Sequence, residues 1–116
     1  NVVGLQWISV YSTNNYIDLY GSITIPKETW TFIGIVYSGS STVAGFRIYI
    51  NNQLDTLITV KDTLTGTLAT NTSTILGYKS GGTPTSGKIR ELIIYNRALN
   101  PLEIQRNYLA TKWRYR

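Results

Sequence analysis

The strongest constraint in this sequence lies near its C-terminus, where a strand pattern leads directly into a capped helix. The run Gly87–Thr111 reads GKIRELIIYNRALNPLEIQRNYLAT. Its first half is rich in β-branched and aromatic residues, which favour extended backbone. Its second half opens with Asn100 at the N-cap, Pro101 at the first helical position and Glu103 at the third, which is a capping box. The run therefore predicts a helix over 101–110.

The strand expected over 88–95 has an uneven apolar spacing. Ile89 and Leu92 are three residues apart, whereas Leu92 and Ile94 are two apart. A β-bulge near Arg90 would restore a single buried face. Beyond the helix, the ending TKWRYR alternates cations with aromatic residues and predicts a terminal strand over 111–116. Trp113 and Tyr115 on such a strand would cap the core, which is the favoured interpretation, or else stack on sugars or bases or insert into a neighbouring subunit.

The composition indicates an all-β domain with a single core. Charged residues make up only 15% of the 116 residues, and Tyr, Thr, Ile, Val and Trp recur throughout; this composition suits half-buried strands. The sequence has no Cys and no His. Disulfides, thiolate or imidazole metal sites and Cys/His or Ser/His/Asp catalysis are therefore excluded.

Alternating apolar patterns predict two hairpins and a central strand. The first hairpin pairs 2–11 with 16–20, and the second pairs 46–50 with 54–60 across an Asn-Asn turn, which tolerates positive φ. The run 30–37 is apolar on both alternating faces, as in a central strand covered above and below. Further short strands are expected over 22–25 and 74–79, a short edge strand or a loop over 64–71, and a flexible loop over 80–87.

The C-terminal run closely resembles the end signature of the laminin-G-like branch of the concanavalin A-like lectin/glucanase superfamily. In that branch a strand ending IYNRAL precedes a short helix reading xxEIxxNY, here at 94–99 and 101–108. FRIYINNQLD, and TILGYKSGG followed by SGKI, resemble other strands of the family. The resemblance implies an antiparallel β-sandwich of the jelly-roll kind with one short C-terminal helix near 100–110.

The same resemblance bears on completeness and on assembly. Full laminin-G-like domains contain strands ahead of those that match here, so 1–116 is expected to be a single sandwich domain lacking its N-terminal strands, completed by a preceding segment or a neighbouring subunit. The family normally has Asp where Arg90 stands and Arg where Ile93 stands. Ile93 is therefore either an assembly contact or a single exposed apolar residue, which is common. The ending NYLATKWRY also resembles laminin-G-like modules of tailed-phage virion proteins.

The positive charge is concentrated at the C-terminal end. Residues 1–78 hold three basic and four acidic side chains, whereas 79–116 hold eight basic and two acidic ones. A solvated basic tail explains this distribution better than a nucleic-acid site, so nucleic acid is an unlikely partner. No apolar run approaches the ~20 residues of a membrane span.

The acidic residues argue against an enzyme and against a cofactor. Glycoside hydrolases of the superfamily carry paired carboxylates in an ExDxxE strand, whereas the six acids here are isolated in sequence. Laminin-G-like modules often hold Ca²⁺, and Asp55, Asp62 and Asn71 are the residues that could meet across loops to bind it. Solvated surface acids are the better interpretation, because Ca²⁺ takes six to eight oxygen ligands. We therefore expect no enzymatic activity, no metal and no cofactor.

Two functions follow. The favoured one is a non-catalytic structural module of a phage virion or other extracellular or cell-surface assembly, oligomeric and bound to other surface proteins. The alternative is a lectin-like module that binds a cell-surface glycan. The expected interface residues are Arg90, Ile93, Lys112, Trp113, Arg114, Tyr115 and Arg116, and the expected ligand-binding aromatics are Trp7, Tyr37, Tyr49 and Tyr78.

Overall fold

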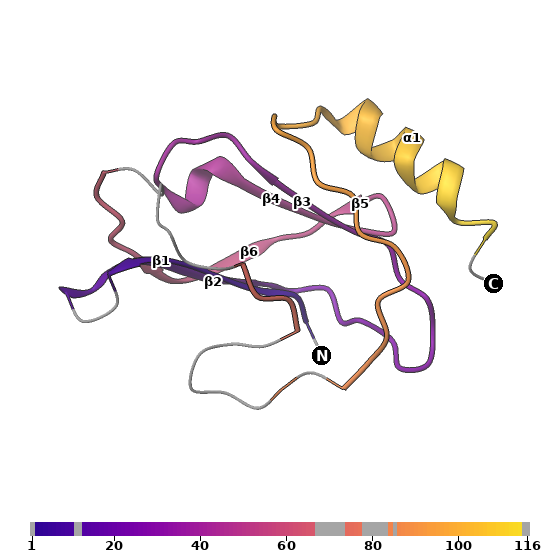
Figure 1. The fold of residues 1–116 in the computed structure, drawn as a ribbon, viewed down its shortest axis with the longest axis horizontal. Helices are drawn as coiled ribbons and strands as arrows, with labels where there is room; N and C mark the ends of the chain where they lie inside the picture. Colours follow the sequence, from indigo (N-terminus) through magenta and orange to yellow (C-terminus); the bar gives the residue numbers. More distant parts are fainter. Residues whose placement is uncertain (1, 11–12, 67–73, 78–83, 85, 115–116) are drawn as a thin grey trace.

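A computed structural model describes residues 2–10, 13–66, 74–77, 84 and 86–114. It contains two antiparallel three-stranded sheets and one C-terminal helix (Figure 1). The first sheet has the order β1 (Gly4–Val10), β2 (Asn15–Gly21), β6 (Leu57–Asp62). The second has the order β3 (Ile33–Tyr37), β4 (Phe46–Ile50), β5 (Gln53–Leu54), with a 3₁₀ turn at Val43–Gly45 before β4. The helix α1 spans Pro101–Thr111. The all-β sandwich with one short C-terminal helix is confirmed.

The core lies between the two sheets and is centred on their middle strands. Ile17 and Leu19 of β2 and Ile48 of β4 are completely buried. Phe46 and Ile50 belong to the same apolar cluster and lie on the same face of β4 as Ile48, because alternate residues of a strand share a face. The alternating sequence FRIYI therefore specifies which face of β4 enters the core.

The first predicted hairpin is confirmed. β1 and β2 pair in antiparallel register from Gly4 with Tyr20 to Ile8 with Tyr16, and the register shifts between Ile8 and Val10. Asn14 in the connection has a φ of 55°, the left-handed conformation that asparagine tolerates.

The second predicted hairpin is right at its turn and wrong in its second strand. Asn51 and Asn52 have φ of 48° and 71°, as a hairpin turn of this kind requires. However, only Gln53–Leu54 pair with β4, whereas Leu57–Asp62 pair with β2 in the other sheet. The predicted strand 54–60 is thus divided between two sheets, because the chain crosses the sandwich at Asp55.

The run 30–37 does not form the predicted central strand. Only Ile33–Tyr37 form a strand, and among the described residues this strand pairs on one side alone, with β4. Ile33 and Ile35 face the same way as their buried partners Ile50 and Ile48, yet they are 44% and 45% exposed. An edge position explains this exposure, since a side chain at an open edge is covered from one side only.

Four further expectations about strands are corrected where the structure describes them. Residues 22–25 form an irregular segment, because the side chain of Asp55 binds the backbone N–H groups of Ser22 and Ile23. The run 88–95 pairs with no strand of the described chain, so neither the predicted strand nor its β-bulge forms. The described residues 74–77 and 111–114 form no strand either. Residues 64–66, where an edge strand or a loop was expected, lie in a loop. The rest of these segments and most of the loop 80–87 lie outside the described residues.

The carboxylate of Asp55 joins the two sheets. Its Oδ1 accepts hydrogen bonds from Ser22 N (2.9 Å), Ser22 Oγ (2.9 Å) and Ile23 N (3.0 Å), just after β2 of the first sheet. Its own N–H donates to Ile48 O (2.8 Å) in the second sheet. Gly21 lies against Asp55 Oδ2, at a point where any Cβ would collide with that oxygen. Asp55 itself is buried, whereas Ser22 is exposed, so these bonds lie at the border of the core.

We predict that Asp55→Ala lowers the free energy of unfolding by about 3 kcal/mol, because it leaves two backbone N–H groups and a hydroxyl without their acceptor in a part-buried site. Asp62→Ala is the matched control, since Asp62 is exposed and accepts one bond, from Val43 N. We expect the control to lose about 1 kcal/mol. Urea unfolding of the two variants measures the difference, and equal losses would contradict the joining role of Asp55.

Candidate interaction surface

The helix α1 begins as the sequence predicts. The side chain of Asn100 accepts from Glu103 N (3.0 Å), and Glu103 Oε2 accepts from Asn100 N (2.9 Å), which completes the capping box. Ile104 is buried against Val36 and Tyr49, on the face of the second sheet that points away from the core. Leu99 packs against the same cluster, as the expected hydrophobic staple between Leu99 and Ile104 requires.

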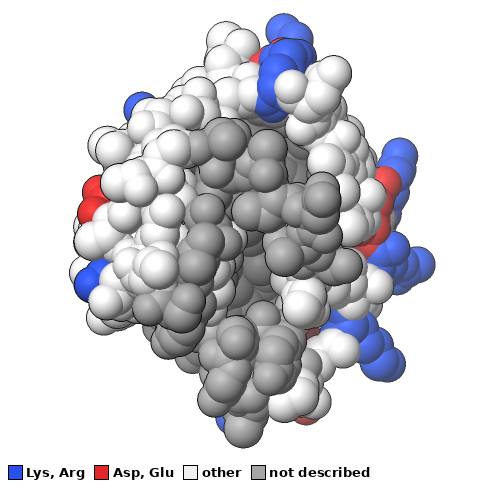
Figure 2. All heavy atoms as spheres, turned by 60° about the vertical axis from the view of Figure 1, so that its left-hand side comes forward, with Lys and Arg blue, Asp and Glu red and all other residues white. Residues whose placement is uncertain are grey.

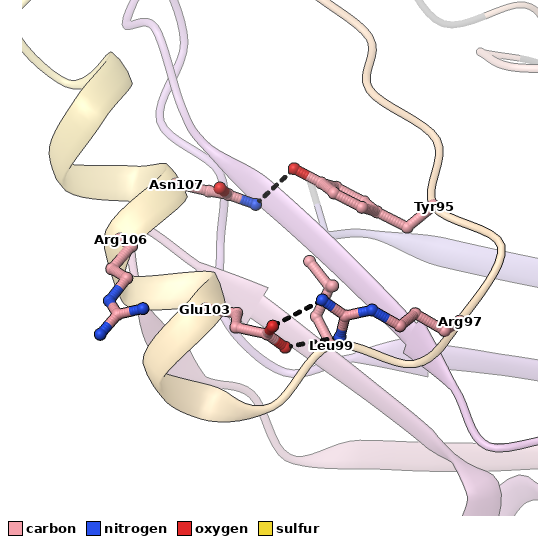
Figure 3. A pocket seen from close by; sticks show the side chains of 6 residues that line it. All are labelled: Tyr95, Arg97, Leu99, Glu103, Arg106 and Asn107. Carbon is pink, nitrogen blue, oxygen red and sulfur yellow. Dashed lines mark hydrogen bonds and ion pairs between the residues drawn. The ribbon is translucent and has the colours of Figure 1, made fainter.

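Two side-chain contacts tie the extended segment before α1 to the helix itself (Figure 3). Arg97 makes a bidentate ion pair with Glu103, with nitrogen–oxygen distances of 2.6 and 2.9 Å. Asn107 Nδ2 donates to the Tyr95 hydroxyl at 3.0 Å. The Arg97 guanidinium, together with the Asn100 backbone N–H, lowers the pKa of Glu103 from its ordinary 4.5 to about 2. Through its bond to Glu103, Arg97 also has a raised pKa.

A small hollow of about 120 Å³ lies between this segment and the helix. Four of its six lining side chains already bind one another in the two contacts above, and Arg106 and Leu99 complete the wall. In Figure 3, Arg97 and Tyr95 point at the helix, whereas Arg106 extends away from them. The hollow is therefore a seam between two packed segments, and no ligand site follows from it.

The segment over 89–95 exposes large apolar side chains to solvent. Ile94 is 83% exposed and Ile89 is 66% exposed, and Leu92, Ile93 and Tyr95 are also exposed. We call these five residues the apolar run. The sequence singles out Ile93 alone, but Leu92 and Ile94 on either side of it are more exposed. Exposure therefore extends along the run and is not limited to one isoleucine.

The structure brings several predicted interface residues together at the C-terminal end of α1. Arg114 Nη1 lies 3.9 Å from Glu91 Oε1, so the chain after the helix returns to the residue next to Arg90. Lys112 Nζ lies 4.7 Å from the ring centroid of Trp113 and 5.7 Å from that of Tyr108. Cations over ring faces at these distances attract the ring electrons. Tyr115 and Arg116 lie outside the described residues.

Trp30 also lies beside a predicted interface residue, Arg90, although the sequence pattern did not indicate this. The Arg90 guanidinium carbon lies 6.0 Å above the centre of its ring, and Trp30 itself is exposed. Its place at the start of the stretch 30–37 suggested a core position. Figure 2 shows one face of the molecule, which is mostly uncharged where it is described and has Lys and Arg side chains along its right-hand rim with acidic side chains between them.

The aromatic residues proposed for sugar binding do not share a surface in the described part of the chain. Tyr49 is 5% exposed and packs under α1. Tyr37 stacks on Phe46 with centroids 4.3 Å apart, and its hydroxyl accepts from Ser41 N. Tyr37 and Tyr49 lie on opposite faces of their sheet, because Tyr37 pairs with Phe46, three residues from Tyr49. The Trp7 side chain and Tyr78 lie outside the described residues, and the ligand role of the set stays a prediction.

The acids considered for calcium do not fit a shared site. Asp55 Oδ1 already accepts three hydrogen bonds, and Asp62 accepts from Val43 N. Asn71 lies outside the described residues. Within the part of the chain that the structure describes, no three His, Cys, Asp or Glu side chains come close enough to hold a metal ion. In the same part, no helix is long and apolar enough to span a bilayer.

The sandwich and its helix match a known family. The model of the concanavalin A-like lectin/glucanases superfamily, in its laminin-G form, matches residues 3–105. The chain belongs to this superfamily. No curated protein matches the chain.

One solved structure is similar to this laminin-G-like domain. It is residues 221–444 of an S-layer domain-containing protein from Clostridium thermocellum, with a TM-score of 0.55 and 16% sequence identity. The match covers 93% of this chain and 63% of the other, so this chain spans less than two thirds of that structure. At this identity, the likeness shows a shared fold.

We predict that Glu103→Gln removes a stabilisation that depends on pH. Because the folded-state pKa of Glu103 is lowered to about 2, the charged form stabilises the fold above the ordinary pKa of 4.5, and this contribution is lost as the pH falls towards 2. The melting temperature of the wild type should therefore exceed that of the variant at pH 7, and the two should converge as the pH falls to 2. Thermal unfolding of both proteins across this pH range measures the difference in melting temperature.

An Arg97→Gln background supplies the control, because it removes the group that contributes most to the lowered pKa. In that background the change in melting temperature caused by Glu103→Gln should vary less with pH. The same pH dependence with and without Arg97 would contradict the ion-pair explanation.

Proposed function

We propose that this laminin-G-like domain is a non-catalytic interaction module of a surface assembly, on a virion or a cell surface, and that it docks onto other proteins of that assembly. The observation that carries the proposal is the exposed apolar run over 89–95. The basic and aromatic side chains around Arg90 and Trp113 border it and provide polar contacts at its rim.

The apolar run is energetically unfavourable while it is exposed to water. Leu92, Ile93 and Ile94 are consecutive residues and each is more than half exposed, so the segment presents apolar groups to water along its length. Burying apolar surface gains roughly 25 cal/mol per Å². Large exposed apolar areas typically mark protein contacts. A partner that docks on the run would therefore gain binding free energy from each apolar side chain that it buries.

The arrangement of acids supports a non-catalytic role. Glycoside hydrolysis requires two carboxyl groups on either side of one bond, free to move protons or to attack. Here Asp55 joins the two sheets, Glu103 pairs with Arg97, and Asp18 lies buried beside Gln6. These carboxylates make structural contacts in this fold.

Two observations support a place on a surface. The similar solved structure belongs to an S-layer domain-containing protein, so the fold occurs in a protein that carries an S-layer domain. The ending NYLATKWRY resembles laminin-G-like modules of tailed-phage virion proteins, which favours a virion. An interaction module at an exposed assembly is consistent with both settings.

A photo-crosslinking amino acid at position 94, expressed in the intact source particle or cell envelope, tests the docking surface. Ile94 is the most exposed member of the apolar run, so the substitution costs little stability. We expect adducts of defined mass with another protein of the assembly. Position 24, which is exposed in the loop after β2, is the matched control and should give none. No adduct at position 94, or the same adducts from both positions, would count against docking through this run.

Carbohydrate binding is the second candidate function, because the superfamily that matches the chain includes lectins. Its residues would be Trp7 and Tyr78, since Tyr37 and Tyr49 pack within the fold. We predict that any signal on a glycan array falls at least tenfold in Trp7→Ala or Tyr78→Ala, because stacking on an aromatic face is lost. Tyr20→Ala, at another exposed aromatic residue, is the control and should keep the signal. A glycan array without signal would count against carbohydrate binding and leave protein docking as the remaining candidate function.

A further inference from the structure

The segment that carries the apolar run lies antiparallel along α1. Three side-chain contacts join residues that ascend along the segment to residues that descend along the helix end: Glu91 with Arg114, Tyr95 with Asn107, and Arg97 with Glu103. Figure 1 shows the segment and α1 side by side. We call residues 86–114 the C-terminal layer. Residues before 91 lie at the same end of this layer as the chain that follows α1.

The helix exposes a stripe of its own on the side away from the sheet. Leu102, Arg106 and Leu109 are four and three residues apart, so they share one face of α1. On the opposite face, Ile104 is buried on the second sheet and Tyr108 packs against the phenylalanine ring just before β3. Leu102 is 64% exposed and Leu109 is 43% exposed, and Arg106 is exposed too. We call Leu102, Arg106 and Leu109 the helix stripe.

The helix stripe borders the segment of the apolar run. Arg106 lines the hollow between this segment and α1, together with Tyr95 and Arg97 (Figure 3). Trp113, four residues after Leu109, is 61% exposed just beyond the end of the helix. Exposed apolar side chains therefore occur on both halves of the C-terminal layer, and a partner that docks on one half can also reach the other.

The C-terminal layer holds more positive charge than its own acids neutralise. Residues 86–114 contain six basic and two acidic side chains, which gives a net charge of +4. Each acid is already beside an arginine, because Glu103 lies 2.6 Å from Arg97 and Glu91 lies 3.9 Å from Arg114. Within the described chain, no carboxylate lies within ion-pair distance of three other cations in the layer: Lys88, Arg106 and Lys112.

These cations determine which kind of partner can cover the layer. Lys88 and Lys112 lie at the same end of it, and Arg106 lies between the two leucines of the helix stripe. A partner that buries the apolar side chains also takes these charges out of water, which is costly unless each charge is paired. The partner therefore needs carboxylates beside its own apolar groups. Nucleic acid is a poorer fit, because its phosphates would pair with the cations and leave the aliphatic side chains uncovered.

We propose that the partner of this layer is an acidic amphipathic segment of another protein, whose apolar side chains cover the apolar run and the helix stripe and whose carboxylates pair with Lys88, Arg106 and Lys112. The inference rests on the proposed docking function and deepens it by naming the chemistry of the partner. Opposite charges also steer two proteins towards each other, at a rate that falls as the ionic strength rises.

Photo-crosslinking in the intact particle or cell envelope locates the partner segment. A crosslinking amino acid is placed at position 94 in one protein and at position 109 in a second, since both side chains are exposed. The adducts are digested and sequenced by mass spectrometry. We expect both positions to label one segment of one partner, in which Asp and Glu outnumber Lys and Arg.

A pair of double variants tests the role of the cations. Lys88→Gln/Arg106→Gln should lower the adduct yield at position 94 about fivefold, because two charge pairs with the partner are lost. Arg47→Gln/Lys61→Gln is the matched control, since it removes one arginine and one lysine from β4 and β6, outside the layer. The control should leave the yield unchanged. Far-UV circular dichroism of the purified variants checks that α1 is retained.

Ionic strength gives a second readout that needs no charge substitution. The adduct yield at position 94 should fall about threefold when NaCl is raised from about 50 to about 500 mM, because salt screens charge pairs at an interface.

The outcomes separate this inference from the docking function on which it rests. No adduct at position 94 would overturn both. Adducts whose yield responds neither to the loss of Lys88 and Arg106 nor to salt, or falls equally in the control variant, would overturn the acidic partner and leave docking intact. A labelled segment without an acidic excess, a second copy of this chain, or adducts that carry nucleotides would do the same. Adducts at position 94 with none at position 109 would overturn the covering of the helix stripe.

Discussion

The two sheets depend on one buried carboxylate at the point where the chain passes between them. Asp55 follows two residues of pairing in the second sheet and precedes β6 in the first. Its Oδ1 binds the segment after β2, and its N–H binds β4. Because the donors are backbone groups, the bonds fix the direction of the chain as well as its position. The register of both sheets at this end follows from that geometry.

Features determined by a few adjacent residues were predicted well from the sequence. The turn at Asn51-Asn52 depends on the tolerance of asparagine for positive φ. The start of α1 depends on Asn100, Pro101 and Glu103, which satisfy the first turn of the helix among themselves. These signals are local, so no knowledge of the rest of the fold is needed to interpret them.

The errors arise where a segment depends on a distant partner. The run 30–37 has the apolar pattern of a central strand, but a strand is central only if another lies beside it, and β3 has one neighbour in the described chain. The same holds for 88–95, whose apolar residues match no ladder in the part of the chain that the structure describes. The joining role of Asp55 and the contact of Arg90 with Trp30 were also missed, because each connects residues far apart in sequence.

The attachment of α1 has a mechanical consequence. The apolar run is joined to β6 by residues 63–88, and it is bound to α1 by the pairs Arg97–Glu103 and Tyr95–Asn107. The helix in turn is held on the second sheet by side chains, chiefly by the buried Ile104. The sheets are held by ladders of backbone hydrogen bonds in two directions. A pulling force on a partner bound at the run would therefore separate α1 from the sheet before it broke these ladders, and the load would then pass to β6 through residues 63–88. The run and the helix would leave the sandwich together and keep their own two contacts.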